Sequence, residues 1–454
     1  MGKVKTVYFC KECGHESPKW LGKCPSCGSW NTFVEEKVSS GNSRSGKKGL
    51  IRSEAKPMRV SEIPDVSEER ISMPSSEFNR VLGGGLVKGS IVLLGGEPGI
   101  GKSTLILQNV LSIRSINVLY VSGEESASQL KMRANRLGKV ADNVYILCDT
   151  SLESIIANAE KLNPQLIVVD SIQTIASDEM ESSAGSIGQV RECTARLLRY
   201  AKETGVPVII VGHINKEGAI AGPKVLEHIV DAVIQFEGDR QFLYRLLRPV
   251  KNRFGATSEI GIYEMVDKGL REVLNPSEIL LSRTNGEAMS GTSVGITVEG
   301  AMPILIEVQA LVSTAAYGTP QRSVTGYDPR RLNMLLAVLE KRARFQLSRK
   351  DVFLNITGGF RVSDPAMDLA VVAAVMSSNF DITLQKDIAF TGEVGLSGEI
   401  RPVTRIEQRV AEAAKLGYNK IFIPAGNLKQ KISAGKIEVV ECGRLETLFR
   451  NIFG

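Results

Sequence analysis

Short apolar runs alternate with amphipathic stretches through the middle of the chain. The apolar runs are rich in Val, Ile and Leu, as is typical of short buried strands, and they occupy 117–121, 143–148, 165–170 and 206–212. Helical patterns near 126–137, 151–161 and 186–204 separate these runs. Because strands that alternate with helices form parallel sheets with helices on both faces, we predict an α/β domain here.

Two further patterns divide the chain. Residues 35–60 are rich in Ser, Gly, Lys and Arg, a composition that cannot bury apolar area and predicts a flexible basic linker. A third domain, also α/β, is expected to begin near Asn275-Pro276, and its apolar, small-residue stretch 366–378 predicts a buried helix. The predicted divisions are 1–34, the linker 35–60, 61–270 and 275–454.

Composition agrees with a soluble globular protein. The chain has 454 residues, of which 43% are hydrophobic and 23% charged. No apolar run approaches the roughly 18 residues that a membrane span needs. The start of the chain lacks the apolar core of a signal peptide, because Cys10, Lys11 and Glu12 interrupt it. We therefore expect a cytoplasmic protein whose cysteines stay reduced unless they bind metal.

The positive charge is concentrated at one end. The net charge is +6, and residues 1–60 hold 12 Lys and Arg against 5 Asp and Glu, so the rest of the chain is close to neutral. A nucleic-acid partner explains this bias, and so does a merely solvated segment.

A phosphate-binding loop follows the apolar run 91–94. The segment 96–103 fits G-x-x-x-x-G-K-[ST], in which glycines let backbone N–H groups point at phosphate oxygens while the lysine reaches the β- and γ-phosphates. The residues predicted to bind ATP are Gly96, Glu97, Pro98, Gly99, Ile100, Gly101, Lys102, Ser103 and Thr104.

Acidic residues at strand ends predict hydrolysis. Asp170 ends the run 165–170, where a carboxylate can hold Mg²⁺ together with the Ser103 hydroxyl. Glu124 follows the run 117–121 and is favoured to orient the attacking water, with its neighbour Glu125 as the competitor. His213 follows the run 206–212 and is a candidate sensor of the γ-phosphate, or a structural residue.

Four cysteines near the start predict a structural zinc site. Cys10 and Cys13, and Cys24 and Cys27, form two C-x-x-C pairs, and four thiolates give a closed tetrahedral shell. A redox dithiol and an iron–sulfur site are the alternatives. The chain's two tryptophans, Trp20 and Trp30, fall in this region and either pack its small core, which we favour, or stack on a base.

Together these motifs resemble a known family. The phosphate loop and the segments 122–126 and 166–171 look like a RecA-type ATPase core, and 251–255 reads Lys-Asn-Arg-Phe-Gly, which marks one branch of it. With the four-cysteine knuckle, the whole chain strongly resembles the bacterial RadA (Sms) family of recombination and repair ATPases. The resemblance implies a hexameric ring with nucleotide at subunit interfaces, and recombinase filaments as partners.

Basic residues are candidates for trans action and for DNA contact. Lys251 and Arg253 could stabilise transition-state charge in a neighbouring subunit, contact DNA, or simply end a charged hairpin. In RecA-type motors, a loop that follows the strand matching 206–212 faces the central DNA channel. Lys216 and Lys224 fall in this loop and are therefore predicted to contact DNA phosphates.

The last domain resembles the proteolytic domain of Lon without its chemistry. In the matching register, Ala366 stands where the serine nucleophile belongs and Arg409 where the lysine base belongs. Alanine has no nucleophile and arginine stays protonated, so we expect a scaffold that also offers DNA a basic surface. The basic candidates, which a solvated face explains as well, are Arg322, Arg330, Arg331, Lys341, Arg342 and Arg344.

The favoured function is that of a DNA-dependent ATPase in recombinational repair that processes recombination intermediates and promotes branch migration on single-stranded or branched DNA. An ATP-dependent assembly switch or DNA clamp is the main alternative, and an ATP-driven protease is the weaker one.

Overall fold

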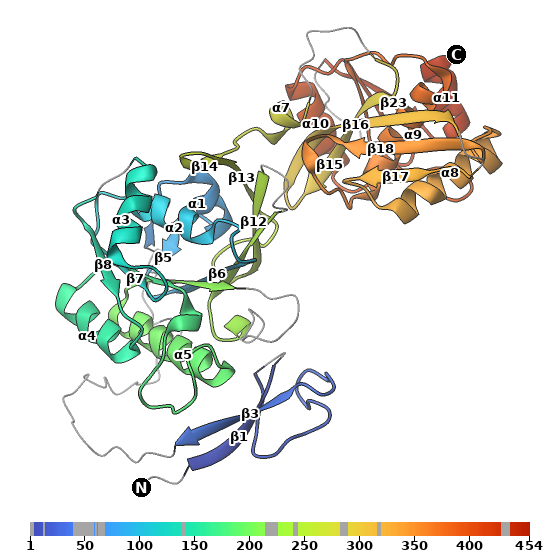
Figure 1. The fold of residues 1–454 in the computed structure, drawn as a ribbon. Coiled ribbons are helices and arrows are strands. Elements are labelled where there is room, and N and C mark those ends of the chain that lie inside the picture. The colour runs from blue at the N-terminus through green and yellow to red at the C-terminus, as the bar shows by residue number, and fades with distance from the viewer. Residues whose placement is uncertain are drawn as a thin grey trace. The chain divides into compact units, whose positions relative to one another are not determined.

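Two compact units, Met1–Glu272 and Val273–Gly454, make up the computed structural model (Figure 1). It describes residues 4–11, 14–39, 59, 61, 69–138, 141–213, 226–238, 244–281, 289–315, 319–427 and 436–454. Each unit is built around its own sheet, so we treat the two in turn. Within the described residues, no helix combines the length and the apolar character that a membrane crossing requires.

The chain begins with a small antiparallel sheet in the order β2-β1-β3. Its strands are β1 (Val4–Cys10), β2 (Glu16–Ser17) and β3 (Phe33–Ser39). Cys10, Cys24 and Phe33 are buried together in the middle of this ribbon. So small an apolar cluster cannot stabilise a fold by itself, which is why a bound metal is expected to supply the stability.

The main sheet of the first unit has the order β14-β13-β12-β11-β6-β10-β9-β7-β8. The strands from β11 to β8 in this order are parallel, and β12 to β14 extend the sheet antiparallel. They are β6 (Ile91–Gly96), β7 (Val118–Ser122), β8 (Val144–Cys148), β9 (Leu166–Asp170), β10 (Val208–His213), β11 (Ala232–Glu237), β12 (Tyr244–Asn252), β13 (Gly261–Val266) and β14 (Gly269–Glu272).

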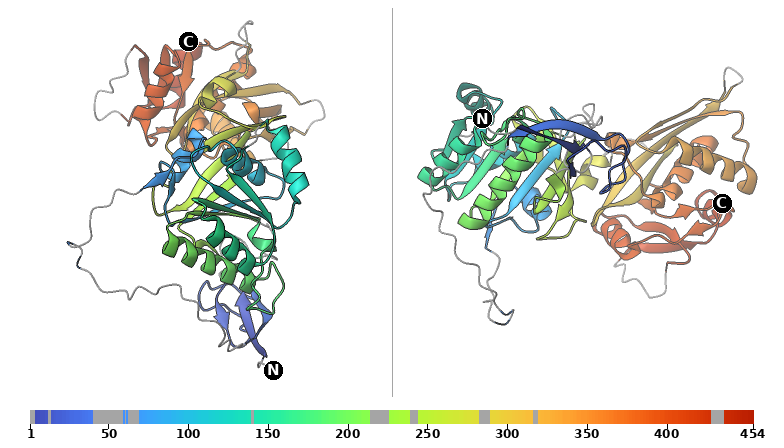
Figure 2. Two further views of the ribbon diagram at one scale, coloured as in Figure 1. Left: turned by 90° about the vertical axis from the view of Figure 1, so that its left-hand side faces the viewer. Right: turned by 90° about the horizontal axis from the view of Figure 1, so that it is seen from below.

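Helices cover both faces of this sheet, as predicted (Figure 2). Alternate residues of β6 show why: Val92 and Leu94 join one apolar cluster, and Ile91 and Leu93 join the other. The helices are α1 (Ser76–Leu82), α2 (Lys102–Val110), α3 (Ala127–Arg136), α4 (Leu152–Leu162) and α5 (Ile187–Thr204), with the short β4 (Arg70–Ile71), β5 (Leu86–Val87) and 3-10 helix η2 (Ile172–Thr174) between them.

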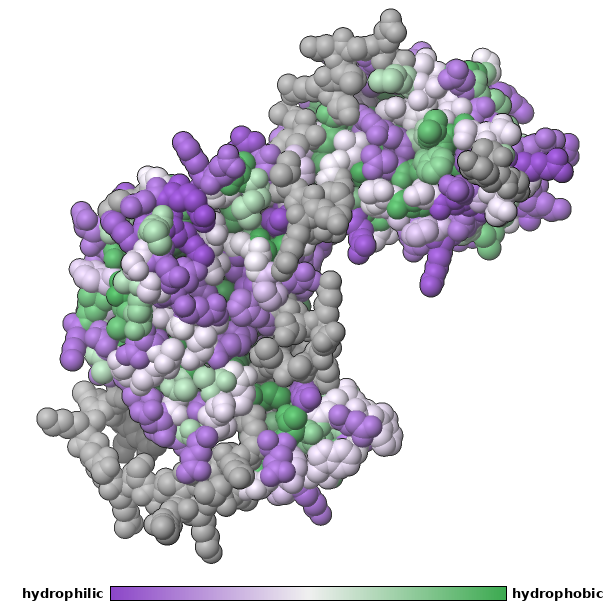
Figure 3. Space-filling view, in the orientation of Figure 1, coloured by the Kyte–Doolittle hydropathy of each residue, from purple (hydrophilic) through white to green (hydrophobic). Residues whose placement is uncertain are grey.

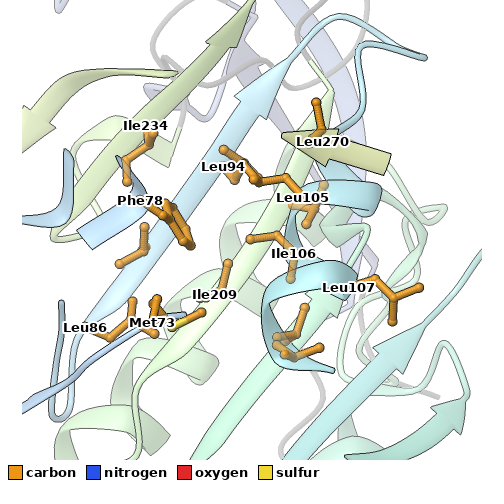
Figure 4. Packing of buried hydrophobic residues seen from close by; sticks show 14 of the residues in the cluster. Met73, Phe78, Leu86, Leu94, Leu105, Ile106, Leu107, Ile209, Ile234 and Leu270 are labelled. Atoms are coloured by element: carbon orange, nitrogen blue, oxygen red, sulfur yellow. The ribbon is translucent and has the colours of Figure 1, made fainter. Parts of the chain in front are cut away.

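Helices α1, α2 and α3 pack on the first face and α4 and α5 on the second. Figure 4 shows the first face, where Phe78 of α1 and Leu105 and Ile106 of α2 meet Leu94 of β6. Serine N-caps position four of these helices. The side chains of Ser75, Ser126, Ser151 and Ser186 accept backbone N–H groups of the first turn of α1, α3, α4 and α5.

The strands predicted at 117–121, 143–148, 165–170 and 206–212 are parallel to one another, as expected, and the antiparallel β12–β14 are additions that were not predicted. One expectation about this sheet needs correction. We predicted 143–148 as a buried strand, but β8 ends the described sheet order, and Tyr145 and Ile146 are exposed. The sequence does not encode which strand lies at an edge, because that depends on the order of the whole sheet.

The second unit has a sheet in the order β17-β18-β16-β15-β19-β22-β23. Helix α9 (Asp368–Phe380), predicted as 366–378, is buried against one face, and α10 (Ile406–Lys415) packs on the other. The strands are β15 (Thr292–Glu299), β16 (Met302–Thr314), β17 (Arg322–Thr325), β18 (Lys350–Ile356), β19 (Ile388–Phe390), β22 (Lys420–Pro424) and β23 (Glu438–Cys442), beside the hairpin of β20 (Glu393–Val394) and β21 (Ile400–Arg401). The other helices are α7 (Pro276–Leu280), α8 (Pro329–Ala343) and α11 (Leu445–Phe453), with η3 (Thr357–Gly359) and η4 (Pro365–Met367).

Gly295 allows α9 to approach this closely. A Cβ added there would lie 2.5 Å from Met367 Cε and 2.8 Å from Ala370 Cβ. Over both units, the face shown in Figure 3 is largely hydrophilic, with apolar side chains scattered in small groups.

Candidate functional site

Four parallel strands bring their carboxyl ends to one edge of the first unit's sheet. In the register, His213 of β10 is level with Gly96 of β6, and Ser122 of β7 is level with Asp170 of β9. Ligands of open α/β sheets bind outside such ends. The predicted ATP loop leaves this edge at Gly96 and leads directly into α2.

Glycines let the loop between β6 and α2 take its shape. Gly99 has a φ of 77° and Gly101 a φ of 113°, conformations that side chains disfavour. At Gly96 a Cβ would lie 2.6 Å from the carbonyl oxygen of Phe236. The backbone therefore curls tightly between strand and helix, as a cradle for phosphates requires.

Lys102 is the first residue of α2, and only 3% of it is exposed. Its ammonium donates to the carbonyl oxygens of Gly96 at 2.8 Å and Glu97 at 2.9 Å, and lies 3.2 Å from His213 Nδ1. Burial lowers the pKa of Lys102 to about 8, although the charges of Asp170 and Glu124 partly offset this. An anion bound beside Lys102 would favour its charged form and raise this pKa.

Glu124 contacts His213, the residue that also contacts the Lys102 ammonium. The Ser171 hydroxyl donates to Glu124 Oε1 at 2.6 Å, and His213 Nε2 lies 3.4 Å from the same oxygen. Burial raises the pKa of Glu124, but the hydrogen bonds from Ser171 and His213 outweigh it and leave the pKa below its ordinary value. Glu124 therefore stays ionised, and 48% of its side chain is open to solvent, where a water can approach.

Glu125 points to a different partner. Its carboxylate pairs with Arg133 of α3 at 2.5 Å, and its backbone N–H donates to Ser122 Oγ. The structure brings Glu124 to Lys102 and His213, whereas Glu125 belongs to the turn that leads into α3.

His213 connects Lys102 with Glu124. Because the Lys102 ammonium can only donate, His213 Nδ1 accepts, which leaves the proton on Nε2 facing Glu124. His213 is also the last described residue before 214–225, so the chain runs from this contact into the segment where Lys216 and Lys224 were predicted to bind DNA. Both lysines lie outside the described residues.

Asp170 has a partner that sequence reasoning missed. The hydroxyl of Tyr120, a fully buried residue of β7, donates to Asp170 Oδ2 at 2.6 Å. Burial, followed by the charge of Asp170, raises the pKa of Tyr120 well above its ordinary value, so the hydroxyl keeps its proton. A tyrosine inside an apolar strand needs a hydrogen-bond partner, and that need was the available signal.

The residues present fit a magnesium ion by type. Ser103 stands in the first turn of α2, and Asp170 ends β9, two strands away from β6 at the same sheet edge. A hydroxyl and a carboxylate beside a phosphate loop are oxygen ligands of the kind that Mg²⁺ prefers.

Lys251 and Arg253 lie near the amino ends of the parallel strands, whereas the phosphate loop lies at their carboxyl ends. Asn252 is level with Ala232 of β11, which is level with Val92 near the start of β6. Gly96 is four residues further along β6, roughly 13 Å at the usual rise of a strand. Neither basic residue can therefore complete the ATP site of its own chain.

Asp231 holds this basic pair in place. Its buried carboxylate accepts from the Ile91 backbone N–H at 3.1 Å, from Lys202 Nζ at 3.0 Å and from Arg253 at 3.2 Å. Lys251 Nζ donates to the carbonyl oxygens of Glu227 and Val230 at 2.5 and 2.8 Å. Desolvation, with the nearby Arg253, lowers the pKa of Lys251. Sequence reasoning also missed Asp231, since no motif marks it.

Close backbone packing fixes the end of β12. A Cβ at Gly255 would lie 2.9 Å from the Cα of Gly83, which ends α1 with a φ of 82°. Asn252 Nδ2 donates to the Val81 carbonyl oxygen at 3.2 Å, and Arg70 donates to that of Phe254 at 2.9 Å. The segment Lys-Asn-Arg-Phe-Gly is therefore held rigidly with Arg253 half-exposed.

In the second unit, the positions matched to a serine–lysine dyad are structural. Ala366 is buried, and Arg409 is 1% exposed. Arg409 donates to Asp364 Oδ2 at 2.7 Å and to the carbonyl oxygens of Ile296 and Thr404 at 2.5 and 3.0 Å. These hydrogen bonds hold the protonated guanidinium in place, and no nucleophile stands at position 366.

One of the predicted basic surface residues is engaged internally. Arg331 makes a bidentate pair with the buried Asp368 at 2.7 and 2.5 Å, so it stabilises the fold. The remaining candidates are exposed and stay predictions: Arg322, Arg330, Lys341, Arg342 and Arg344.

Three of the four predicted zinc ligands come together. The sulfur atoms of Cys10, Cys24 and Cys27 all lie within 4.8 Å of one another. Cys13 lies outside the described residues. The donor set fits a thiolate zinc site, in which such closeness of sulfurs is required. The preference for burying the tryptophans was wrong, because Trp20 and Trp30 are 51% and 68% exposed.

Comparisons with known proteins place these features in a family. Family models match in three places: a rubredoxin metal binding domain at 8–35, an AAA domain at 57–219 and subunit ChlI of Mg-chelatase at 307–427. A KaiC-like protein of solved structure from Pyrococcus horikoshii OT3 is 22% identical, and the match covers 46% of this chain and 100% of that protein, with a TM-score of 0.39.

Full-length relatives give the clearest result. The chain is 49% identical over 459 residues to a protein from Bacillus subtilis (strain 168), and 48% identical over 454 residues to one from Pseudomonas aeruginosa PAO1. Each match covers 100% of both chains, and each relative is described as DNA repair protein RadA.

Proposed function

Because the chain belongs to the bacterial RadA family of DNA repair proteins, we propose that it is a DNA-stimulated ATPase of recombinational repair. In this proposal it processes recombination intermediates and promotes branch migration as a ring-shaped motor on single-stranded or branched DNA. The observation that carries the proposal is the position of His213. This residue contacts Lys102 and Glu124, and it directly precedes the segment 214–225 that is predicted to bind DNA.

Hydrolysis would use groups at the carboxyl edge of the sheet. Lys102 and the loop N–H groups hold the triphosphate, and Glu124 orients the attacking water. Mg²⁺, held by Ser103 and Asp170, would neutralise phosphate charge. Tyr120 and Ser171 position the two carboxylates, and His213 relays the presence of the γ-phosphate to the segment 214–225.

Lys251 and Arg253 would act on a neighbouring subunit. They lie at the end of the parallel strands opposite the phosphate loop, so head-to-tail packing of copies can bring them to the next ATP site. A positive charge supplied in this way stabilises the developing phosphate charge. The exposure of Arg253 supports this role and, equally, a contact with DNA, whereas Lys251 would first have to release its carbonyl partners.

The proposed partners follow from the family and from charge. We expect a homohexamer in the cytoplasm that acts on DNA and on recombinase filaments in the response to DNA damage. Lys216, Lys224, Lys251 and Arg253 would contact phosphates, so binding should weaken steeply with salt.

A peptidase role has little support. Ala366 carries no nucleophile, and Arg409 is locked into the hydrogen bonds described above. An ATP-dependent assembly switch or DNA clamp remains the second candidate, since the same loop could bind ATP without turning over.

The test is ATP hydrolysis by the full chain with and without single-stranded DNA. We expect stimulation by DNA, and none in a Glu124→Gln variant that still binds ATP. Nucleotide-dependent assembly with negligible turnover in either condition would instead support the switch.

A further inference from the structure

Two indole rings are exposed on the metal-binding ribbon, which is unusual for tryptophan. Trp20 and Trp30 are 51% and 68% exposed, although most tryptophans in folded proteins are largely buried. Each leaves a large apolar face in water. Such rings are typical of surfaces that bind a partner through aromatic contact.

Both rings lie against one short backbone segment, Gly22–Lys23. A Cβ on Gly22 would be 3.8 Å from the Trp20 ring, and Trp20 Nε1 donates to the Phe33 carbonyl oxygen at 3.2 Å. The backbones of Trp30 and Lys23 form an isolated antiparallel β-bridge, and the Lys23 ammonium lies 5.5 Å from the centre of the Trp30 ring. These contacts restrain the rings but leave them open on the outside.

Two exposed lysines stand in the same stretch as the rings. Lys19 and Lys23 are the charged residues of the segment 17–34, which Glu16 and Glu35 flank in the sequence. Aromatic faces combined with cations fit a polymer that has flat bases and a phosphate backbone. An acidic protein surface would satisfy the lysines but would not use two open ring faces for stacking.

We propose that Trp20, Trp30, Lys19 and Lys23 form an aromatic surface that binds single-stranded DNA, with bases stacked on the rings and phosphates paired with the lysines. The inference rests on the proposed DNA-dependent function and adds a second DNA contact to it. This contact lies outside the ATPase sheet and depends on the metal that folds the ribbon.

The chain offers a direct probe, because Trp20 and Trp30 are its only tryptophans. Intrinsic indole fluorescence of the full, zinc-loaded protein reports on this surface alone. We expect oligo(dT) to quench it, with the same concentration dependence as the anisotropy of a labelled oligo(dT). Binding that raises the anisotropy and leaves the fluorescence unchanged would overturn the inference.

Substitutions test the stacking itself. Trp30→Ala should weaken oligo(dT) binding roughly tenfold, and Trp30→Phe should retain most of the affinity because a ring remains. Tyr145→Ala, which removes an exposed aromatic ring from β8, is the matched control and should change nothing. Zinc content and far-ultraviolet circular dichroism of each variant confirm that the ribbon is folded.

The outcomes separate this inference from the proposed function. If the unsubstituted protein hydrolyses ATP faster with DNA but Trp30→Ala binds oligo(dT) normally, only the aromatic surface is wrong. If the unsubstituted protein neither binds oligo(dT) nor responds to it, both fail. Quenching by a recombinase protein in the absence of DNA, with none by oligo(dT), would assign the surface to a protein partner and overturn the inference.

Discussion

At the scale of single residues, the site depends on one histidine between two charges of opposite sign. Lys102 donates to one ring nitrogen of His213, and Glu124 faces the other. A γ-phosphate that draws Lys102 away from its present carbonyl partners changes what His213 can bond. In the proposed mechanism, His213 therefore senses bound ATP at the point where the chain leaves β10 for the segment 214–225.

The two adjacent glutamates differ in their expected effects. Glu124→Gln should lower the turnover of ATP about 100-fold or more, because the amide cannot act as a base, while ATP binding persists. Glu125→Gln loses only the partly exposed pair with Arg133, so turnover should change less than about twofold. Single-turnover hydrolysis and a fluorescent nucleotide separate the two effects. Equal losses in both variants would contradict the assignment of Glu124.

The lowered pKa of Lys102 predicts a pH dependence of ATP binding. Above its pKa of about 8, free Lys102 loses its proton, whereas the bound triphosphate favours the charged form. The complex then holds more protons than the free protein, so ATP affinity should fall as the pH rises past 8, with proton uptake. Calorimetry in buffers of different ionisation enthalpy measures this uptake.

Lys102→Arg is the control for this effect, because a guanidinium stays protonated throughout this range. Its affinity for ATP should show no such fall with pH, whatever its absolute value. The same pH dependence in both proteins would exclude Lys102 as its source.

At the scale of elements, the end of β12 is held by a buried carboxylate. The Asp231 carboxylate accepts hydrogen bonds from the start of β6, from Lys202 of α5 and from Arg253. The Lys251 ammonium donates to the carbonyl oxygens of Glu227 and Val230, which precede Asp231 in the chain. Glu227 and Val230 follow the segment 214–225 in the chain. Residues 226–230 therefore link that segment to Lys251, which bonds them, and to Arg253. His213 connects the other end of the same segment to the ATP loop.

Substitution of Asp231 tests this connection. Asp231→Asn keeps the shape and the bond to Ile91 but removes the charge that holds Arg253, so DNA-stimulated turnover should fall about tenfold. ATP affinity should be unchanged, because the phosphate loop lies at the opposite end of the parallel strands. A merely structural role would instead lower the melting temperature and affect both quantities.

Lys202→Ala is the matched control for Asp231. Lys202 bonds the other oxygen of the same carboxylate and is half-exposed, so its removal leaves the Arg253 pair intact. Turnover should stay within about twofold of the original. A loss equal to that of Asp231→Asn would show that the carboxylate acts on the fold and not on Arg253.

The sequence predicted the positions of helices and strands better than their burial and their contacts in the fold. Strands β7, β9 and β10 and helices α3 to α5 begin within two residues of their predicted positions, because periodicity is a local property. The exposure of β8 and the antiparallel strands β12–β14 depend on sheet order, which no local pattern carries. Motifs located Lys102, Asp170 and Glu124, but the roles of Tyr120 and Asp231 rest on contacts between residues far apart in the chain.

At the scale of the whole molecule, we propose that the two ends of the first unit's parallel strands carry complementary halves of an ATP site. One end offers the phosphate loop, and the other presents Arg253 and Lys251. A surface that fits a different surface on the next copy builds rings or filaments, not closed pairs. Family membership and this arrangement together support a ring in which each ATP lies between two subunits.

The central claim is a DNA-stimulated ATPase completed by a neighbouring subunit, and a mixture of two inactive proteins tests it most directly. Lys102→Ala removes a chain's own phosphate contact but keeps its Arg253, and Arg253→Ala does the reverse. ATP hydrolysis is measured for each alone and for a one-to-one mixture, with and without single-stranded DNA. We predict that each alone is inactive and that the mixture regains DNA-stimulated hydrolysis at about a quarter of its interfaces. A mixture as inactive as its components, in rings shown to have exchanged subunits, would contradict the account.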